Sequence, residues 1–339
     1  MRAVRFRHHG DPAAVLSVDD VPVPVKGPDD LLIRMTTRPI NPSDLMYVRG
    51  EYGREATFPS PAGFEGVGVV ERADRAGTYR EGARVAVAAT GTWQDYVSAA
   101  PAELIPVPDA MPDEVACQLT VNPFAARLLV DQLDVPPGGW LLLSAGASAV
   151  CRMVLAYAAR RRIRCLHLVR RPEQVTPLRL LGADEVIDVS AGPWVDRVLA
   201  VTSGGAAAAI DSVGGQVGRG LLDCLRPGGR LVVFGALSGE PIPLPSRQVI
   251  FSSLTVRGFW LPERLAALEP HDRARLTEEV VADVADGWPG VDVAGRYALP
   301  EVSAAVRHSA RTGGAGKVLL TERRPDVPAP GPVGDPRSE

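Results

Sequence analysis

The chain has 339 residues, of which 46% are hydrophobic, and a formal net charge of -3, values typical of a globular protein with about two domains. A pI near 6.0 and the lack of a face-sized basic cluster argue against nucleic acid as a partner. No apolar stretch reaches the roughly 18 residues of a membrane span, and no signal-peptide core follows Met1, so we expect a cytoplasmic protein without a membrane partner.

The first part of the chain, residues 1–117, is rich in short apolar runs broken by Pro and Gly. Regular short strands separated by turn residues predict a compact β domain. The runs that we expect to be strands are 31–35, 66–70, 84–88 and 96–99.

From residue 118 to 262 the pattern changes to strands that alternate with helices. This alternation is typical of a doubly wound parallel sheet with an α/β fold. The turn Arg226-Pro227-Gly228-Gly229 is expected to stop a helix and to start the last strand. The expected strands are 140–143, 165–169, 185–188, 208–212 and 230–234.

A nucleotide-binding turn is predicted after the first of these strands. Trp140–Leu143 is apolar, a run of small residues follows, and from Val150 apolar residues recur at helical spacing. Small side chains let phosphate oxygens approach backbone N–H groups at the positive end of a helix. The turn departs from the G-x-G-x-x-G template, and Cys151 stands at its last small position. The expected cofactor contacts are Ala147, Ser148, Ala149 and Val150.

After Trp260 the sequence predicts one helix over about 263–285 and a final strand over 317–320. The tail, 323–339, is rich in Pro, Gly and charge, a composition typical of disorder.

The four cysteines give no sign of a metal site or a disulfide framework. Cys117, Cys151, Cys165 and Cys224 lie far apart, without a C-x-x-C pair or a histidine at ligand spacing. Cys165, Cys224 and also His167 lie in apolar runs, where a core side chain is the expected role.

Seven short motifs follow one another between residues 8 and 261: His8-His9-Gly10-Asp11-Pro12, Ile40-Asn41-Pro42-Ser43-Asp44, Gly50-Glu51-Tyr52-Gly53, Gly91-Thr92-Trp93, Val121-Asn122-Pro123, Val169-Arg170-Arg171-Pro172 and Gly258-Phe259-Trp260-Leu261. In this order they resemble the mitochondrial-type 2-enoyl thioester reductases of the medium-chain dehydrogenase/reductase superfamily. The resemblance implies a GroES-like β-rich catalytic domain, built from 1–117 and a return segment 263–322, and a Rossmann NADPH-binding domain over 118–262.

Zinc-dependent members of that superfamily differ from this chain where their metal binds. They present a Cys near the position of Asn41, a Gly-His-Glu where this chain has Gly63-Phe64-Glu65, and a lobe of four cysteines that the segment 71–96 lacks. Without nitrogen or sulfur ligands no catalytic zinc is expected. Hydrogen bonds are then expected to activate the substrate oxygen.

The resemblance places the catalytic tyrosine on Tyr52. A phenol can donate a hydrogen bond to a thioester oxygen or a proton to the carbon that becomes carbanion-like after hydride addition. The residues do not choose between these two roles. They also leave open a third interpretation, in which Tyr52 is a loop aromatic that covers the domain.

Two Asn-Pro pairs are expected to hold amides toward a cleft, because a residue before proline favours extended or turn backbone. The resemblance puts Asn122 on the cofactor and Asn41 beside the nicotinamide. The alternative is a turn Asn that bonds its own backbone.

Two further segments and one lysine are implied in cofactor binding. One ends the last strand of the sheet, where a ligand crevice is expected, and another resembles the lining of the nicotinamide and acyl pocket, although an aromatic pair is also common in cores. Lys317 resembles a residue that reaches the cofactor phosphate, and a solvated strand-end charge is the alternative. The first two segments consist of Phe234, Gly235, Ala236 and Leu237, and of Phe259, Trp260 and Leu261.

The end of the second predicted strand favours NADPH. An NAD site has an acidic residue there for the ribose 2′-hydroxyl, whereas this chain offers Arg170 and Arg171, whose cations suit a 2′-phosphate.

The leading hypothesis is NADPH-dependent reduction of the C2=C3 bond of an enoyl thioester on coenzyme A or acyl carrier protein, by a homodimer. One alternative is a quinone oxidoreductase or enone reductase, because Arg49-Gly50-Glu51-Tyr52 also resembles the loop of that group. Another is a nucleotide-binding protein without catalysis, because Cys151 could crowd the turn.

Overall fold

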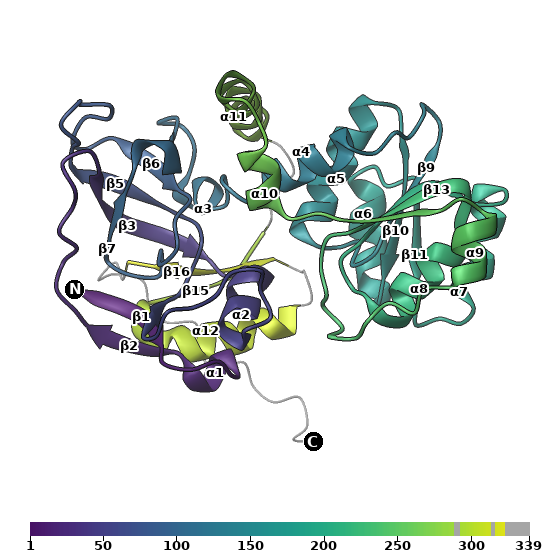
Figure 1. The fold of residues 1–339 in the computed structure, drawn as a ribbon, viewed down its shortest axis with the longest axis horizontal. Coiled ribbons are helices and arrows are strands. Elements are labelled where there is room, and N and C mark those ends of the chain that lie inside the picture. The colour runs from purple at the N-terminus through teal and green to yellow at the C-terminus, as the bar shows by residue number, and fades with distance from the viewer. Residues whose placement is uncertain (288–291, 313–315, 323–339) are drawn as a thin grey trace.

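The computed structural model describes residues 1–287, 292–312 and 316–322. Figure 1 shows two halves side by side: the purple start and yellow end of the chain share one half, and most of the teal and green middle forms the other. The green helix α11 (Pro270–Ala285) packs on the first half. The predicted disordered tail, 323–339, lies outside the described residues.

The middle of the chain forms a six-stranded sheet in which every neighbouring pair is parallel. Strand β9 lies inside the sheet. The next two strands in the chain, β10 and β11, lie outward from it on one side, and β12, β13 and β14 lie outward on the other side. This is the expected doubly wound arrangement, with its switch point between β9 and β12. The order is β11 (Glu185–Asp188), β10 (Arg164–Val169), β9 (Trp140–Leu143), β12 (Ala206–Asp211), β13 (Leu225–Val233) and β14 (Thr255–Gly258).

Helices cover both faces of this sheet because its strands are apolar on both faces. Successive residues of a strand point to opposite sides, so Leu141 and Leu143 pack in one buried cluster, and Trp140 and Leu142 in another. The first cluster includes residues from α4 (Asn122–Asp131), α5 (Ala149–Arg160) and α6 (Val175–Leu180), and the second from α7 (Trp194–Thr202) and α8 (Gly215–Asp223).

Two predictions for this sheet were wrong. Strand β13 begins at Leu225, which pairs with Ala206, and the expected turn residues lie within it at a register shift where Gly228 adopts a φ of +73°. Nor is β13 the last strand, because β14 follows it. All four residues of β14 are exposed, so it lacks the apolar signal that revealed the other strands.

The other half combines both ends of the chain. Strand β16 pairs antiparallel with β3 and parallel with β15, so the return segment extends the sheet of the first segment. The seven-stranded sheet comprises β15 (Val293–Tyr297), β16 (Lys317–Thr321), β3 (Leu31–Pro39), β5 (Gly66–Arg72), β6 (Arg84–Val87), β8 (Leu104–Pro106) and β7 (Tyr96–Ala99), the last paired with β3. A small sheet holds β2 (Ser17–Asp20), β1 (Arg2–Phe6) and β4 (Ser60–Pro61).

The helix predicted over 263–285 is two helices, α10 (Leu261–Ala266) and α11 (Pro270–Ala285). The break falls before Pro270, whose ring suits the first turn of a helix and not its interior. None of the helices in the described ranges is both long and apolar enough to cross a membrane. The remaining helices are α1 (Pro12–Val15), α2 (Pro42–Arg49), α3 (Asp113–Ala116), α9 (Ser246–Phe251) and α12 (Val302–Thr312).

Candidate functional site

The predicted nucleotide turn connects β9 to α5 at the switch point of the parallel sheet. Ala145 adopts a φ of 47° in this turn, and the Ser148 hydroxyl accepts a hydrogen bond from the Cys151 amide at 3.4 Å as the helix begins. The first amides of a helix have no intrahelical acceptor. Residues 147–150 therefore surround the positive end of α5, which is suited to a phosphate group.

Behind the turn, His167 is a core side chain, as expected. Its Nδ1 lies 2.8 Å from the Gly146 carbonyl oxygen, and a Cβ on Gly146 would come within 2.7 Å of the His167 Cβ. Burial lowers the pKa of His167 to about 4, so the neutral ring donates from Nδ1. Its Nε2 has no hydrogen-bond partner in the described part of the chain.

Cys151 points into the core behind the turn and not toward solvent, and its thiol contacts the first residue of the turn. Its side chain is buried, and its Sγ lies 3.5 Å from the Ser144 carbonyl oxygen, on the sheet side of α5. Burial raises the pKa of this thiol to about 11. The hypothesis of a protein without catalysis rested on Cys151, and the packing removes that reason for it.

Asp211, at the end of β12, ties the turn to the next loop. One carboxylate oxygen accepts from the Ser144 hydroxyl at 2.6 Å and from the Val213 amide at 2.9 Å. The other accepts from the Gly214 amide at 3.0 Å. The ends of β9 and β12 are thus joined where a ligand crevice is expected.

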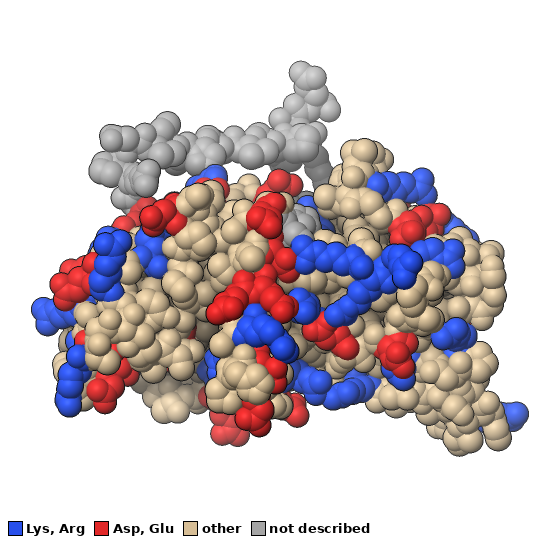
Figure 2. Space-filling view, turned by 90° about the horizontal axis from the view of Figure 1, so that it is seen from above, with Lys and Arg blue, Asp and Glu red and all other residues tan. Residues whose placement is uncertain are grey.

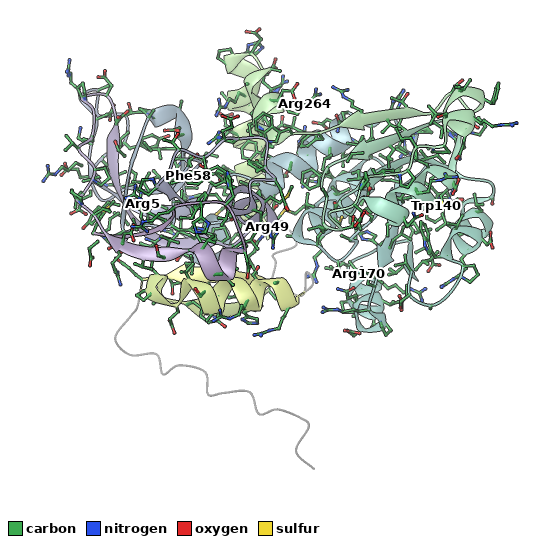
Figure 3. The ribbon with its side chains drawn as sticks, turned by 60° about the horizontal axis from the view of Figure 1, so that its bottom comes forward. Arg5, Arg49, Phe58, Trp140, Arg170 and Arg264 are labelled. Carbon is green, nitrogen blue, oxygen red and sulfur yellow. The ribbon has the colours of Figure 1, made fainter. Side chains whose placement is uncertain are left out.

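The two arginines of the predicted 2′-phosphate site follow β10. Arg170 is exposed, on the part of this half nearest to α12 (Figure 3). The Arg171 guanidinium donates to the Arg311 carbonyl of α12 at 3.3 Å. Both residues are where the sequence placed them, and their contact with a cofactor stays a prediction.

Asn41 and Lys317 meet in a buried polar network. The Lys317 ammonium donates to the Asn41 side-chain oxygen, and the Asn41 amide group donates to Glu65 at 2.7 Å. Asn41 has the expected extended backbone, and its N–H donates to Asp44 at 2.7 Å. Lys317 is buried, so the alternative of a solvated strand-end charge is wrong.

Glu65 extends this network to the start of α4. It accepts hydrogen bonds from the Thr120 hydroxyl at 3.0 Å and the Val121 amide at 3.1 Å. Of the extended or turn backbone expected at Asn122, the structure shows a helical turn: Asn122 is the first residue of α4, where Pro123 suits the first turn and Glu65 holds the preceding amide. The side-chain nitrogen of Asn122 is buried and has no partner among the described residues.

Tyr52 lies in the loop after α2 and faces the other half of the molecule. Its ring packs on Phe64, with centroids 5.1 Å apart and planes at 33°. Its hydroxyl oxygen accepts a hydrogen bond from the Trp260 indole N–H at 3.1 Å. Burial raises the pKa of Tyr52, and the Trp260 hydrogen bond acts against this rise.

The two predicted lining segments lie together. The Phe234 and Phe259 rings are 5.8 Å apart at 62°, and Phe259 is buried whereas Trp260 is 36% exposed. Leu261 begins α10 and packs against the core. Gly235 allows close approach, since a Cβ there would come within 2.8 Å of the Ser212 carbonyl oxygen. Beside Gly235 and Ala236 is a cavity of about 280 Å³, which is also lined by Val233, Ile242, Leu244 and Val256.

The structure thus brings Tyr52 and Trp260 together, and separately Asn41 and Lys317. Sequence reasoning missed the partners Phe64, Thr120 and Asp211. Phe64 stands where zinc-dependent members have the histidine of Gly-His-Glu. An aromatic residue in place of a metal ligand was a sequence signal that this position contacts Tyr52. Acidic and basic side chains are interspersed on the face shown in Figure 2, and no group of three or more His, Cys, Asp or Glu side chains in the described ranges could hold a metal.

Two family models match the chain. Residues 27–109 match the alcohol dehydrogenase GroES-like domain, and residues 149–280 match a model described as zinc-binding dehydrogenase. These matches confirm the predicted fold class, with a GroES-like domain followed by a Rossmann-like domain.

Curated relatives and solved structures agree with this assignment. The mouse mitochondrial enoyl-[acyl-carrier-protein] reductase is 32% identical over 276 residues, which cover 78% of this chain and 73% of the relative. A putative NADPH:quinone reductase from Bacillus thuringiensis is 32% identical with a TM-score of 0.87, over 95% of this chain and 99% of that structure. A mycobacterial protein solved with NADPH is 27% identical with a TM-score of 0.83, over 95% and 100%. The chain belongs to the medium-chain dehydrogenase/reductase family, in which it is similar to the mitochondrial enoyl-[acyl-carrier-protein] reductases.

Proposed function

We propose that this chain reduces the C2=C3 double bond of a 2-enoyl thioester with NADPH. The observation that carries the proposal is the position of Tyr52, whose hydroxyl meets Trp260 of the segment that follows the parallel sheet. The mouse relative is named as an enoyl reductase that acts on acyl carrier protein. An acyl thioester on either acyl carrier protein or coenzyme A is the substrate class that we propose.

The residues present fit NADPH. The start of α5 is suited to the pyrophosphate and Arg170 and Arg171 to the 2′-phosphate. The buried Asn122 nitrogen, which has no partner among the described residues, is a donor that a cofactor oxygen would satisfy. When bound, NADPH supplies the hydride for the β-carbon of the enoyl group.

Tyr52 supplies the matching proton in this proposal. Hydride addition breaks the C2=C3 π bond and leaves an electron pair on the α-carbon and thioester oxygen. The Tyr52 O–H donates its proton to the α-carbon, so one hydride and one proton are added and the saturated thioester and NADP⁺ are formed. The tyrosinate recovers its proton from water.

Quinone reduction is the second candidate function. The specific observation in its favour is the 32% identity to the Bacillus thuringiensis structure, which is named as a putative NADPH:quinone reductase and of which 99% is covered.

A substrate panel separates the two candidates. We expect NADPH oxidation with crotonyl-coenzyme A, a much slower rate with NADH, and no turnover of quinones. Tyr52→Phe is expected to lower kcat on crotonyl-coenzyme A by at least about 100-fold, the lower end of what a positioned general acid contributes. Turnover of quinones alone, or a Tyr52→Phe variant with unchanged kcat on the thioester, would contradict the proposal.

We also propose that the protein is a homodimer. Strand β14 is the edge of the parallel sheet, and its outer side has no neighbouring strand in the described part of the chain. Such an edge is a template for pairing with a second copy. Exposed apolar side chains, Leu244, Ile250, Phe251 and Val256, belong to β14 and the segment before it; we refer to these four residues as the edge patch.

A further inference from the structure

Arg152, the fourth residue of α5, is mostly buried and poorly paired. Its side chain is 12% exposed, and its Nε is buried without a hydrogen-bond partner in the described part of the chain. Its Nη1 lies 4.0 Å from the carboxylate of Asp292, whose side chain is 90% exposed. An ion pair to so exposed a carboxylate contributes little, whereas burial of a charge without a close partner costs free energy. The folded chain thus keeps a guanidinium that lacks a close anion.

The Arg152 side chain lies over the start of α5. Side chains of a helix lean toward its N-terminus and cover the preceding turn. Arg152 follows the N-cap, Ser148, by four residues, which is about 6 Å along the helix axis and within the reach of an arginine.

Two further contacts locate the guanidinium. The Arg152 charge acts on His167, whose pKa it lowers, and His167 supports the nucleotide turn from behind. On the other side, the carbonyl oxygen of Asp292 accepts a hydrogen bond from the Lys317 amide at 2.7 Å. The guanidinium therefore lies between the start of α5 and the strand that carries Lys317.

The nucleotide turn offers fewer backbone donors than its template. In G-x-G-x-x-G the second Gly lets the backbone approach the pyrophosphate, whereas this chain has Ser148 at that position and Cys151 at the third. The Ser148 hydroxyl already accepts from the Cys151 amide, so this amide is partly occupied. A guanidinium can replace such donors, because it presents several N–H groups in one plane and binds phosphate by paired hydrogen bonds.

We propose that Arg152 is a further cofactor-binding residue, which donates hydrogen bonds to the pyrophosphate of NADPH. The inference rests on the NADPH part of the proposed function and holds for either substrate class. It divides the phosphates between two arginines: Arg152 at the start of α5 serves the pyrophosphate, and the exposed Arg170 at the end of β10 serves the 2′-phosphate.

The first test measures binding without turnover. Arg152→Met removes the charge and keeps a long side chain. We expect the Kd for NADPH, from fluorescence titration without substrate, to rise at least about 10-fold, the lower end of what hydrogen bonds to a charged group contribute. Arg152→Lys keeps a point charge and should recover part of the affinity. The matched control is Arg160→Met in the last turn of α5, which should leave the Kd unchanged. An unchanged Kd in Arg152→Met would overturn the inference.

A smaller ligand separates the two phosphate sites. Adenosine 2′-monophosphate carries the 2′-phosphate and lacks the pyrophosphate, and its Kd can be measured by competition with NADPH. Arg152→Met should bind it as the wild type does, whereas Arg170→Ala should bind both ligands more weakly. If Arg152→Met lost the same factor for both ligands, the substitution would disturb the turn as a whole and the inference would be wrong.

Urea unfolding distinguishes a ligand-binding role from a structural one. Because the guanidinium is buried without a close partner, Arg152→Met should be at least as stable as the wild type without cofactor. At one fixed NADPH concentration the variant should gain less stability than the wild type. A variant that is less stable without cofactor and gains as much from NADPH would assign Arg152 to the fold alone.

Asp292→Asn tests the ion pair by itself. It removes the partner of Arg152 and should bind NADPH at least as tightly as the wild type, because no carboxylate then competes with the phosphates. An affinity loss equal to that of Arg152→Met would show that Arg152 serves the ion pair and not the pyrophosphate. NADPH binding that depends on Arg152, in a protein that reduces no thioester, would reject the proposed function alone.

Discussion

His167 shows how one buried residue gives the fold a pH dependence. The fully buried ring beside Gly146 has a pKa of about 4, against an ordinary value of 6.5. Between these values the unfolded chain binds a proton that the folded chain does not. The neutral ring's contribution to stability is therefore fully present above pH 6.5 and is lost as the pH falls toward 4.

We predict that His167 makes the free energy of unfolding fall by about 3 kcal/mol between pH 6.5 and 4. Asp44 acts in the opposite sense, because burial raises its pKa to about 7 and its contribution is lost as the pH rises. The prediction is therefore tested on a difference between two free energies of unfolding. Urea unfolding at several pH values gives the value for the wild type, from which the value for His167→Asn is subtracted. Asn keeps a donor for the Gly146 carbonyl.

The matched control for this prediction is His271→Asn on α11, where the side chain is 79% exposed. We expect the wild type minus His271→Asn difference to be flat between pH 4 and 6.5. A flat difference for His167→Asn as well would show that the buried ring is protonated in the folded protein.

At the scale of elements, Asp211 joins three segments at the end of the parallel strands. It accepts from the Ser144 hydroxyl, which begins the nucleotide turn, and from two amides of the loop before α8. The Ser144 hydroxyl in turn accepts from the Ser212 amide at 2.8 Å. One carboxylate thus fixes the relative position of β9, β12 and the loop that packs on Gly235.

We predict that Asp211→Ala lowers the free energy of unfolding by about 3 kcal/mol, because it leaves buried donors without an acceptor. NADPH should bind at least about 10-fold more weakly, since a displaced turn forfeits the charge-assisted hydrogen bonds to the phosphates. Urea unfolding and NADPH fluorescence titration measure the two effects. Asp223→Ala on α8 removes a partly exposed ion pair with Arg219 and should cost under about 1 kcal/mol. Equal losses in both variants would reject the role of Asp211.

The elements that could be predicted from the sequence are those with their own apolar signal. β9 and β10 are buried on both faces and read as continuous apolar runs. β14 is exposed throughout and was missed, because its position is set by pairing with β13. For the same reason the start of β13 was misplaced: Leu225 is strand only because Ala206 lies opposite.

The candidate site divides in the same way. Tyr52, Asn41 and Arg170 stand in short motifs, and the structure places them on the loops and strand ends where those motifs put them. Their partners could not be read from the sequence, because Glu65 meets Thr120 across 55 positions and Tyr52 meets Trp260 across 208. Contacts of that kind depend on how segments far apart in the sequence pack together, and no local sequence pattern encodes that packing.

At the scale of the whole molecule, the two edges of the parallel sheet differ. At the β11 edge, α6, which contacts β11, ends in two exposed apolar side chains, Leu180 and Leu181, fewer than the four of the edge patch. At the β14 edge, Leu244 and Val256 line one cavity, and Ile250 and Phe251 are 65% and 79% exposed. Apolar surface gathered along an open strand edge favours association there.

We predict that two copies pair their β14 strands around a twofold axis, which places the same residues of each copy against one another. The wild type should sediment with about twice the chain mass of 36.0 kDa. Val256→Lys puts a cation on the edge strand, where like charges would face each other across the axis, and should shift the protein toward the single-chain mass. Leu180→Lys changes an equally apolar, more exposed residue at the opposite edge and should leave the mass doubled. A wild type of single-chain mass would reject the dimer, and loss of the dimer in Leu180→Lys alone would move the interface to the β11 edge.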